Sequence, residues 1–67
     1  MQTVTIAYWR GTKFPDLPWN NGQELQFTKR QRNNAIDKIL SCGYNVMLQR
    51  DGDELIIWID NGKFRQS

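Results

Sequence analysis

Histidine is absent from the 67-residue sequence, cysteine occurs once, and proline occurs only twice. Without histidine the chain lacks the commonest general base and the commonest ligand of transition metals. Cys42 has no histidine to activate it and falls at the C-terminal end of a predicted helix, where the helix dipole disfavours a thiolate. No glycine-rich phosphate loop is present. We therefore expect no enzymatic activity, no catalytic residue and no cofactor.

Acidic residues are also few, and three of the seven fall in the run DGDE, as Asp51, Asp53 and Glu54. These carboxylates are enough for a weak magnesium site. The Asp-Gly pair, however, is typical of the tip of a β-hairpin, where glycine tolerates a positive φ. The hairpin accounts for the run, so we expect no metal site.

Long hydrophobic runs are missing as well. No segment approaches the roughly 18 apolar residues that a membrane-spanning helix needs. The start MQTVTIAYWRG has no basic region, no continuous apolar stretch and no small-residue cleavage site, so it does not predict a signal peptide. A single cysteine suits a reducing compartment. The expectation is one domain over residues 1–67, cytoplasmic and without a membrane partner.

Hydrophobic periodicity predicts three strands and one helix. TVTIAYWR (3–10) alternates strictly, and YNVMLQRDGDELIIWID (44–60) forms two strands around the turn Asp51-Gly52. A helix is predicted over 29–42, because TKRQ (28–31) fits a capping box and Gly43 supplies a stop. Two further short strands stay open as alternatives, ELQFT (24–28) at an edge and KFRQ (63–66) after Asn61-Gly62.

These elements predict an α+β fold, as a single small β-α-β-β domain with a three-stranded antiparallel sheet, or with four or five strands if the alternatives form. ELIIWID (54–60) is apolar on both sides, so we expect it at the centre of the sheet. Its neighbours would be the first strand and its hairpin partner, all antiparallel, with the helix on one face. The side chains expected beneath the helix are Val4, Ile6, Tyr8, Val46, Leu48, Leu55, Ile57 and Ile59.

One helix covers one face, and the other face is not polar. It would carry Trp9, Met47, Ile56 and Trp58. Either the loop KFPDLPWNNG (13–22) folds beneath this face as a lid, or a partner docks on it. We expect a divided loop, with Phe14 and Leu17 buried beneath the sheet and Trp19 at least partly exposed.

Basic residues open the predicted helix, at Lys29, Arg30 and Arg32. Positive charge at this end opposes the helix dipole, and an external phosphate or carboxylate would relieve it. The alternative is that these long side chains are solvated, with DGDE or Asp16 nearby. Arg32 falls at the centre of the apolar stripe, so its stem is expected to pack while its guanidinium emerges at the helix end, or the guanidinium reaches a specific carboxylate.

The run from AIDKIL (35–40) through CGY (42–44) into a hairpin resembles the helix, glycine, aromatic and strand order of the HicA-type toxin fold, over about half of the chain. The histidine on which those RNases depend is missing here, so the resemblance implies no RNase activity. In kind, the chain resembles small inhibitors and accessory proteins of phages and mobile elements.

Two functions follow. The first is a protein-binding inhibitor or adaptor of the phage or mobile-element type, docking through the apolar sheet face and the loop, with a homodimer through that face as a variant. Its expected binding residues are Trp9, Trp19, Met47, Ile56 and Trp58. The alternative is a nucleic-acid binder with aromatic stacking and the cations Arg10, Lys13, Lys29, Arg30 and Arg32. Protein binding ranks first, because residues 1–50 carry a charge of +4 and residues 51–67 carry −2, which does not form a uniform phosphate track.

Overall fold

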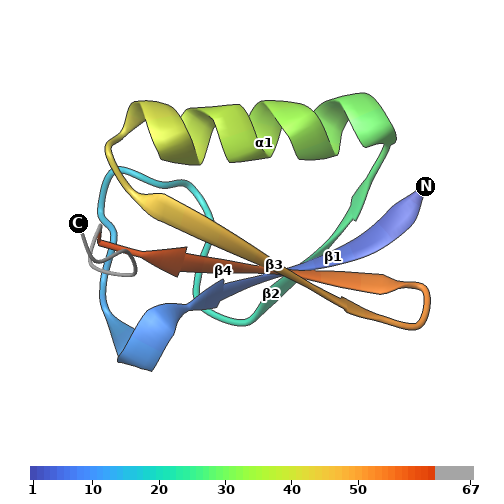
Figure 1. Cartoon of the computed structure of the whole chain (residues 1–67), viewed down its shortest axis with the longest axis horizontal. Helices are drawn as coiled ribbons and strands as arrows, with labels where there is room; N and C mark the ends of the chain where they lie inside the picture. The colour runs from blue at the N-terminus through green and yellow to red at the C-terminus, as the bar shows by residue number, and fades with distance from the viewer. Residues whose placement is uncertain (62–67) are drawn as a thin grey trace.

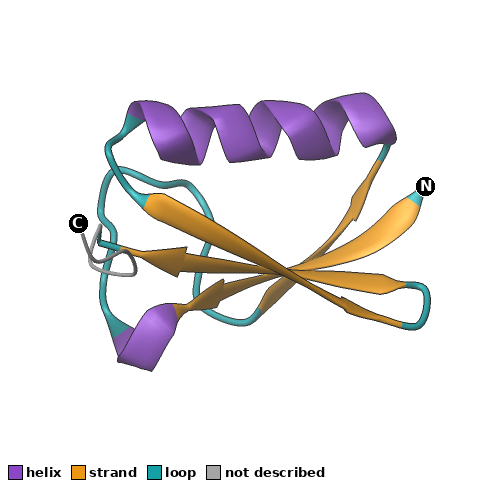
Figure 2. Cartoon of the chain, in the orientation of Figure 1, coloured by secondary structure: helices purple, strands orange, loops and turns teal. Residues whose placement is uncertain are grey.

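Four strands and one α-helix make up the computed structural model, which describes residues 1–61 (Figures 1 and 2). In chain order they are β1 (Gln2–Tyr8), the short 3₁₀ turn η1 (Trp9–Gly11), β2 (Gln23–Phe27), α1 (Lys29–Ser41), β3 (Asn45–Asp51) and β4 (Glu54–Asp60). The fold is α+β, as predicted. The order β-β-α-β-β corrects the expected β-α-β-β, because the edge strand that was only an alternative forms as β2. The other alternative, KFRQ, lies outside the described residues.

The sheet has the order β2-β1-β4-β3 and is mixed (Figure 1). β2 and β3 run antiparallel to their neighbours, with Val4 opposite Leu25 and Met47 opposite Trp58. The two central strands, β1 and β4, are parallel, with Val4 opposite Leu55. The central position of β4 is confirmed, and the sheet has the four strands that were kept open as an alternative to three. The expectation that all neighbours are antiparallel is wrong. One additional strand before the helix reverses the chain once more, so β4 arrives parallel to β1.

Helix α1 begins and ends close to where its sequence signals predict. The Thr28 hydroxyl accepts from the Gln31 N–H at 3.2 Å, and the Gln31 side chain accepts from the Thr28 N–H at 2.9 Å. This capping box satisfies amide groups that would otherwise lack partners. At the other end, Gly43 takes a φ of 89°, and the Tyr44 N–H reaches the Ile39 carbonyl at 3.3 Å. The helix stops at Ser41, one residue before the predicted end.

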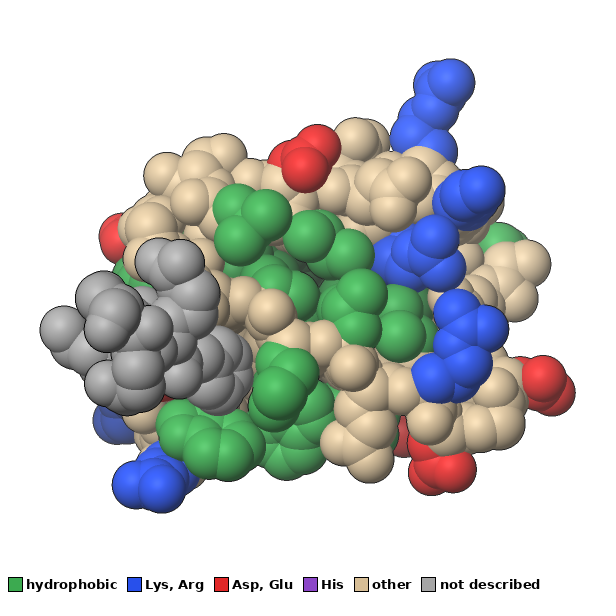
Figure 3. Space-filling view, viewed as in Figure 1, with side chains coloured by type: hydrophobic (Ala, Val, Ile, Leu, Met, Phe, Trp, Pro, Cys, Tyr) green, Lys and Arg blue, Asp and Glu red, His purple; other side chains and the backbone are tan. Residues whose placement is uncertain are grey.

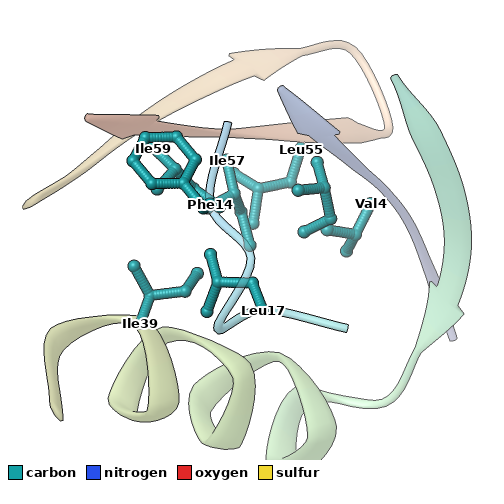
Figure 4. Packing of buried hydrophobic residues seen from close by; sticks show 8 residues of the cluster. Val4, Phe14, Leu17, Ile39, Leu55, Ile57 and Ile59 are labelled. Atoms are coloured by element: carbon teal, nitrogen blue, oxygen red, sulfur yellow. The ribbon is translucent and has the colours of Figure 1, made fainter. Parts of the chain in front are cut away.

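The core lies between α1 and the sheet (Figure 4). β4 contributes its alternate residues, β1 and α1 add to them, and the loop supplies the rest. The buried side chains of this cluster are Val4, Ile6, Phe14, Leu17, Ile39, Leu55, Ile57 and Ile59. Tyr8 and Val46 pack against it while half-buried. Leu48 was expected in this core but is 52% exposed, because edge strand β3 twists away from α1 along its length (Figure 1).

The 13–22 loop packs into this same core, not beneath the sheet. Phe14 and Leu17 are 3% and 7% exposed, and Phe14 meets the rings of Tyr8 and Tyr44 edge-on, with centroids 4.9 Å and 4.6 Å away. The Tyr8 N–H donates to Asn21 Oδ1 at 2.9 Å, and the Gly22 N–H donates to the Ile6 carbonyl at 2.7 Å. These contacts hold the loop on the helix side. The interpretation of the loop as a lid on the opposite face is therefore wrong.

Candidate protein-interaction surface

The side of the sheet away from α1, here called the outer face, is defined by the strand register. Residues opposite each other in neighbouring strands share a face, and Val4 and Ile6 point into the core, so Thr3 and Thr5 point outward. The Gln26 side chain, opposite Thr3, donates to the Thr3 hydroxyl at 2.9 Å on this side. The outer face consists of Thr3, Thr5, Ala7, Glu24, Gln26, Asn45, Met47, Gln49, Asp51, Glu54, Ile56, Trp58 and Asp60, of which Asp60 is buried.

An aromatic cluster occupies one end of the outer face. Trp58 lies in register between Ala7 and Met47, and Trp9 meets it edge-on with ring centroids 5.9 Å apart. The Trp58 indole N–H donates to Gln49 Oε1 at 2.8 Å, which fixes the ring on the surface. Trp9, Trp58 and Ile56 are half-buried, and Met47 is 43% exposed. The structure thus brings together four of the five predicted protein-binding residues.

The fifth, Trp19, lies elsewhere. Its carbonyl accepts the Tyr8 hydroxyl, and its half-buried ring lines a shallow groove with Phe27 of β2 and Ala35 and Lys38 of α1. This groove opens between the helix and β2, on the helix side of the sheet. Phe14 and Leu17 are buried and Trp19 is partly exposed, as expected for a divided loop, but Phe14 and Leu17 lie on the helix side of the sheet and not beneath it. Trp19 therefore does not share one docking surface with the other four residues.

Two tyrosines hold the loop against the core, and both phenols favour their neutral form. Burial raises the pKa of Tyr8 above its ordinary value. For Tyr44, desolvation and then the hydrogen bond to Asp16, accepted at 3.2 Å, raise the pKa. Asp16 therefore lies near the C-terminal end of α1 and not beside the basic residues at its start, which removes one of the two acidic neighbours suggested for them.

The predicted basic residues divide between two ends of the molecule. Lys29, Arg30 and Arg32 lie at the start of α1, whereas η1, which holds Arg10, and Lys13 beyond it lie at the other end (Figure 1). Arg32 Nη1 donates to Gln2 Oε1 at 3.0 Å, so the partner of this guanidinium is an amide oxygen and not the carboxylate considered from the sequence. The capping box already occupies the helix start. A single phosphate track through all five cations is not formed.

A fourth cation, Arg50, is close to the β3–β4 hairpin, at the end of the molecule where α1 starts (Figure 1). Arg50 lies opposite Leu55, which is buried, so the register assigns Arg50 to the helix side of β3 near the hairpin. Leu48 and Arg50 are two residues apart in a strand and so point to the same face, and this was the sequence signal that could have predicted the position of Arg50. Asp51 and Glu54 face the other way, and none of these four cations forms an ion pair within residues 1–61.

Comparison with family models, curated proteins and solved structures finds no match. Within the described residues, no group of three or more histidine, cysteine or acidic side chains is arranged to hold a metal ion. No helix in residues 1–61 has the length and apolar character needed to span a membrane. The functional proposal therefore depends on surface chemistry.

Several carboxylates lie together toward the hairpin side of the outer face, and sequence reasoning missed this. Asp51 and Glu54 lie at the hairpin end and Glu24 lies in the row of Ile56, whereas the aromatic end has both the buried Asp60 and Arg10, whose guanidinium carbon is 5.6 Å from the centre of the Trp9 ring. In Figure 3, basic, hydrophobic and acidic side chains follow one another along the side of the molecule away from α1. Acidic residues separated in sequence by 30 positions gather only because β2 and β4 flank β1.

Proposed function

We propose that this chain is a small non-enzymatic protein-binding module that docks through its outer face, in the manner of cytoplasmic inhibitors and adaptors of phages and mobile elements. The observation that supports it is the cluster of Trp9, Met47, Ile56 and Trp58 on a sheet face where neither α1 nor the 13–22 loop packs. Antiparallel sheet faces that meet only water are usually polar. Tryptophan and methionine are enriched at the centres of protein interfaces.

Trp58 is the expected energetic centre of this surface. It lies between Ala7 and Met47 in the sheet, and Trp9 and Gln49 hold its ring in one orientation. A ring that is already ordered loses little conformational freedom on binding. Truncation of such a residue costs about 2 kcal/mol or more of binding free energy. Trp19 is not part of this proposal, because the groove it lines is on the other side of the sheet.

Two adjacent residues of β3 provide a matched test. Met47 and Leu48 are 43% and 52% exposed, but Met47 points to the outer face and Leu48 to the helix side. A photo-reactive amino acid at position 47, expressed in cells of the source organism, should give a covalent adduct with a specific protein, and the same amino acid at position 48 should not. Trp58→Ala should reduce the adduct at position 47 by at least tenfold. Equal adducts from both positions, or adducts from position 48 alone, would overturn the proposal.

Nucleic-acid binding is the second candidate, favoured by the four cations near the start of α1 that lack ion pairs within residues 1–61. Binding to a mixed-sequence oligonucleotide should then weaken steeply with salt. Lys29→Ala or Arg30→Ala should each reduce the slope of log K against log salt by about one unit. Lys13→Ala, at the other end of the molecule, is the control and should leave the slope unchanged. Absence of binding at low salt would eliminate this candidate.

A further inference from the structure

We infer that the free edge of β3 binds a second copy of this chain, as an antiparallel strand pair in which Leu48 lies opposite Leu48 of the other copy. The two sheets then join into one continuous sheet. This inference goes beyond the proposed function and does not depend on it, because the edge of β3 and the outer face are different surfaces.

The backbone of β3 has hydrogen-bonding groups that point away from the sheet. A two-residue turn joins β3 to β4, so Asp51 and Glu54 form a hydrogen-bonded pair at its base. In antiparallel strands such pairs alternate with pairs that are not hydrogen-bonded. The register therefore directs the N–H and C=O groups of Val46, Leu48 and Arg50 away from β4. Within residues 1–61, no other segment is hydrogen-bonded to these groups.

Exposed apolar side chains border the same edge. Four large hydrophobic residues are exposed among residues 1–61, and three of them are Leu40, Met47 and Leu48. Leu40 follows Gln31 by nine residues and so lies on the opposite side of α1 from the groove that Gln31 lines toward β2. It therefore lies on the β3 side of the helix. Figure 1 shows β3 in front of the other strands, and Figure 3, in the same view, shows hydrophobic side chains gathered across the middle of this side.

β3 lacks the features that usually prevent edge strands from pairing. Natural edge strands are often interrupted by proline, charged side chains or a bulge. Residues 45–49 are uncharged and contain no proline, the two charged residues of β3 lie at the hairpin end, and its register with β4 is continuous. The other edge strand, β2, is shorter, carries Glu24 and has no exposed large apolar residue. β3 is therefore the edge that combines free backbone groups with exposed apolar side chains.

The order of residues in β3 selects a second copy in one register. When the two-fold axis lies between Leu48 and its copy, Val46 pairs with Arg50 of the other chain, and all three outward-facing residues of each chain are hydrogen-bonded. A shift by two residues in either direction moves one of these three opposite Tyr44 or Gly52, which lie outside the strands. In the selected register no residue lies opposite one of like charge. The edge of β3 is therefore complementary to itself.

This symmetry also determines how the two copies present their surfaces. The two-fold axis is perpendicular to the joined sheet, so both α1 helices lie on one side and both outer faces lie on the other. Each outer face carries its own cluster around Trp58. A dimer that binds through both clusters attaches more strongly than one copy without any new kind of contact.

Sedimentation equilibrium of the purified chain, from micromolar to millimolar concentration, tests the dimer. Leu48→Lys places two positive charges opposite each other at the two-fold axis and should weaken dimerisation by about tenfold or more. Because Leu48 is 52% exposed, we expect this variant to remain folded by circular dichroism. Gln26→Lys adds the same charge to the other edge strand and should leave dimerisation unchanged.

Cysteine cross-linking tests the register, in chains that carry Cys42→Ala. The Cα atoms of a hydrogen-bonded pair are about 5.5 Å apart, which is within disulfide range, so Leu48→Cys should form a disulfide-linked dimer on mild oxidation. Met47→Cys is the matched control, because Met47 is 43% exposed. In the selected register its Cα lies about 8 Å from the same atom of the other copy, beyond disulfide range. It should cross-link efficiently only when it is mixed with Gln49→Cys, whose position lies opposite.

Each opposing outcome overturns the inference. A chain that is monomeric at millimolar concentration excludes the dimer, and a Leu48→Lys variant that dimerises as strongly as the wild type excludes this edge. Equal disulfide yields from Leu48→Cys and Met47→Cys exclude the register. If Leu48→Lys does not fold, the disulfide yields decide the outcome.

The mass of a covalent adduct separates this inference from the proposed function. A photo-reactive residue at position 47 or 48 that links two copies of this chain reports the edge dimer, and it is not counted in the test of the outer face, which concerns a different protein. A monomeric purified chain, together with an adduct between position 47 and a different protein, would refute this inference and leave the proposed function standing. Absence of both the adduct and the dimer would refute the two together.

Discussion

Replacing Phe14 with alanine tests whether the 13–22 loop is part of the core. Phe14 is 3% exposed, and its ring contacts Tyr8 and Tyr44 edge-on with centroids 4.9 Å and 4.6 Å away. Truncation of a buried phenylalanine costs about 3–5 kcal/mol. Unfolding free energies of about 0.05–0.15 kcal/mol per residue give a chain of this length roughly 3–10 kcal/mol in total. We therefore expect Phe14→Ala to lose most of its stability, although the substitution lies outside every strand and helix.

Urea denaturation followed by far-ultraviolet circular dichroism measures the loss. Phe14→Leu keeps most of the apolar volume and should remain folded while losing about 1–2 kcal/mol. Leu48→Ala is the control, because that side chain is 52% exposed, and it should lose less than about 1 kcal/mol. A loss below about 1 kcal/mol for Phe14→Ala, with an unchanged dependence on urea, would refute the assignment of the loop to the core.

Three further predictions concern β4, Trp19 and the tyrosines. Amide hydrogen exchange should be slowest at Ile57 and Ile59, which lie in a strand paired on both sides, and fast exchange there would contradict the sheet order. With Trp9 and Trp58 replaced by phenylalanine, the fluorescence of half-buried Trp19 should be quenched by acrylamide more than that of a core tryptophan and less than that of the denatured chain, and quenching equal to the denatured chain would contradict its packing on the core. The pKa values of Tyr8 and Tyr44 are raised on folding, so their contribution to stability is complete below the unfolded pKa of about 10 and is lost as pH rises through the folded values. Tyr44→Phe should therefore lower the steepness of alkaline unfolding above about pH 10, as measured by urea midpoints, and an unchanged profile would contradict that pKa direction.

The central strand and the helix were predictable because their signals are local. β4 is apolar on both faces, and Thr28 with Gln31 forms a capping box within four residues. β2 has only five residues, three of them glutamine or glutamate, so its pattern is weak. Its formation nevertheless decides the direction of β4 relative to β1. A short strand with a weak signal was therefore enough to change the predicted sheet from antiparallel to mixed.

The candidate site was predictable only where it follows strand alternation. Alternation places Met47, Ile56 and Trp58 on one face, and the pairing of β3 with β4 confirms that they are neighbours there. The side on which Trp19 lies depends instead on contacts distant in sequence, such as those of Phe14 with Tyr44 and of Tyr8 with Asn21. The grouping of carboxylates on the outer face depends likewise on which strands flank β1. No local pattern in the sequence contains this information.

The parallel pairing of β1 with β4 has a consequence for how the chain is made. Thr3 pairs with Glu54 and Tyr8 with Ile59, so the middle of the sheet joins segments from opposite ends of the described chain. The β3–β4 hairpin and α1 depend on near neighbours, whereas closing β1 onto β4 costs the entropy of a long loop, which slows folding. During translation, β1 emerges first and its edge on the β4 side has no partner until β4 has left the ribosome. The unpaired edge of β1 therefore makes the nascent chain more prone to aggregation than the folded protein, in which β4 covers that edge.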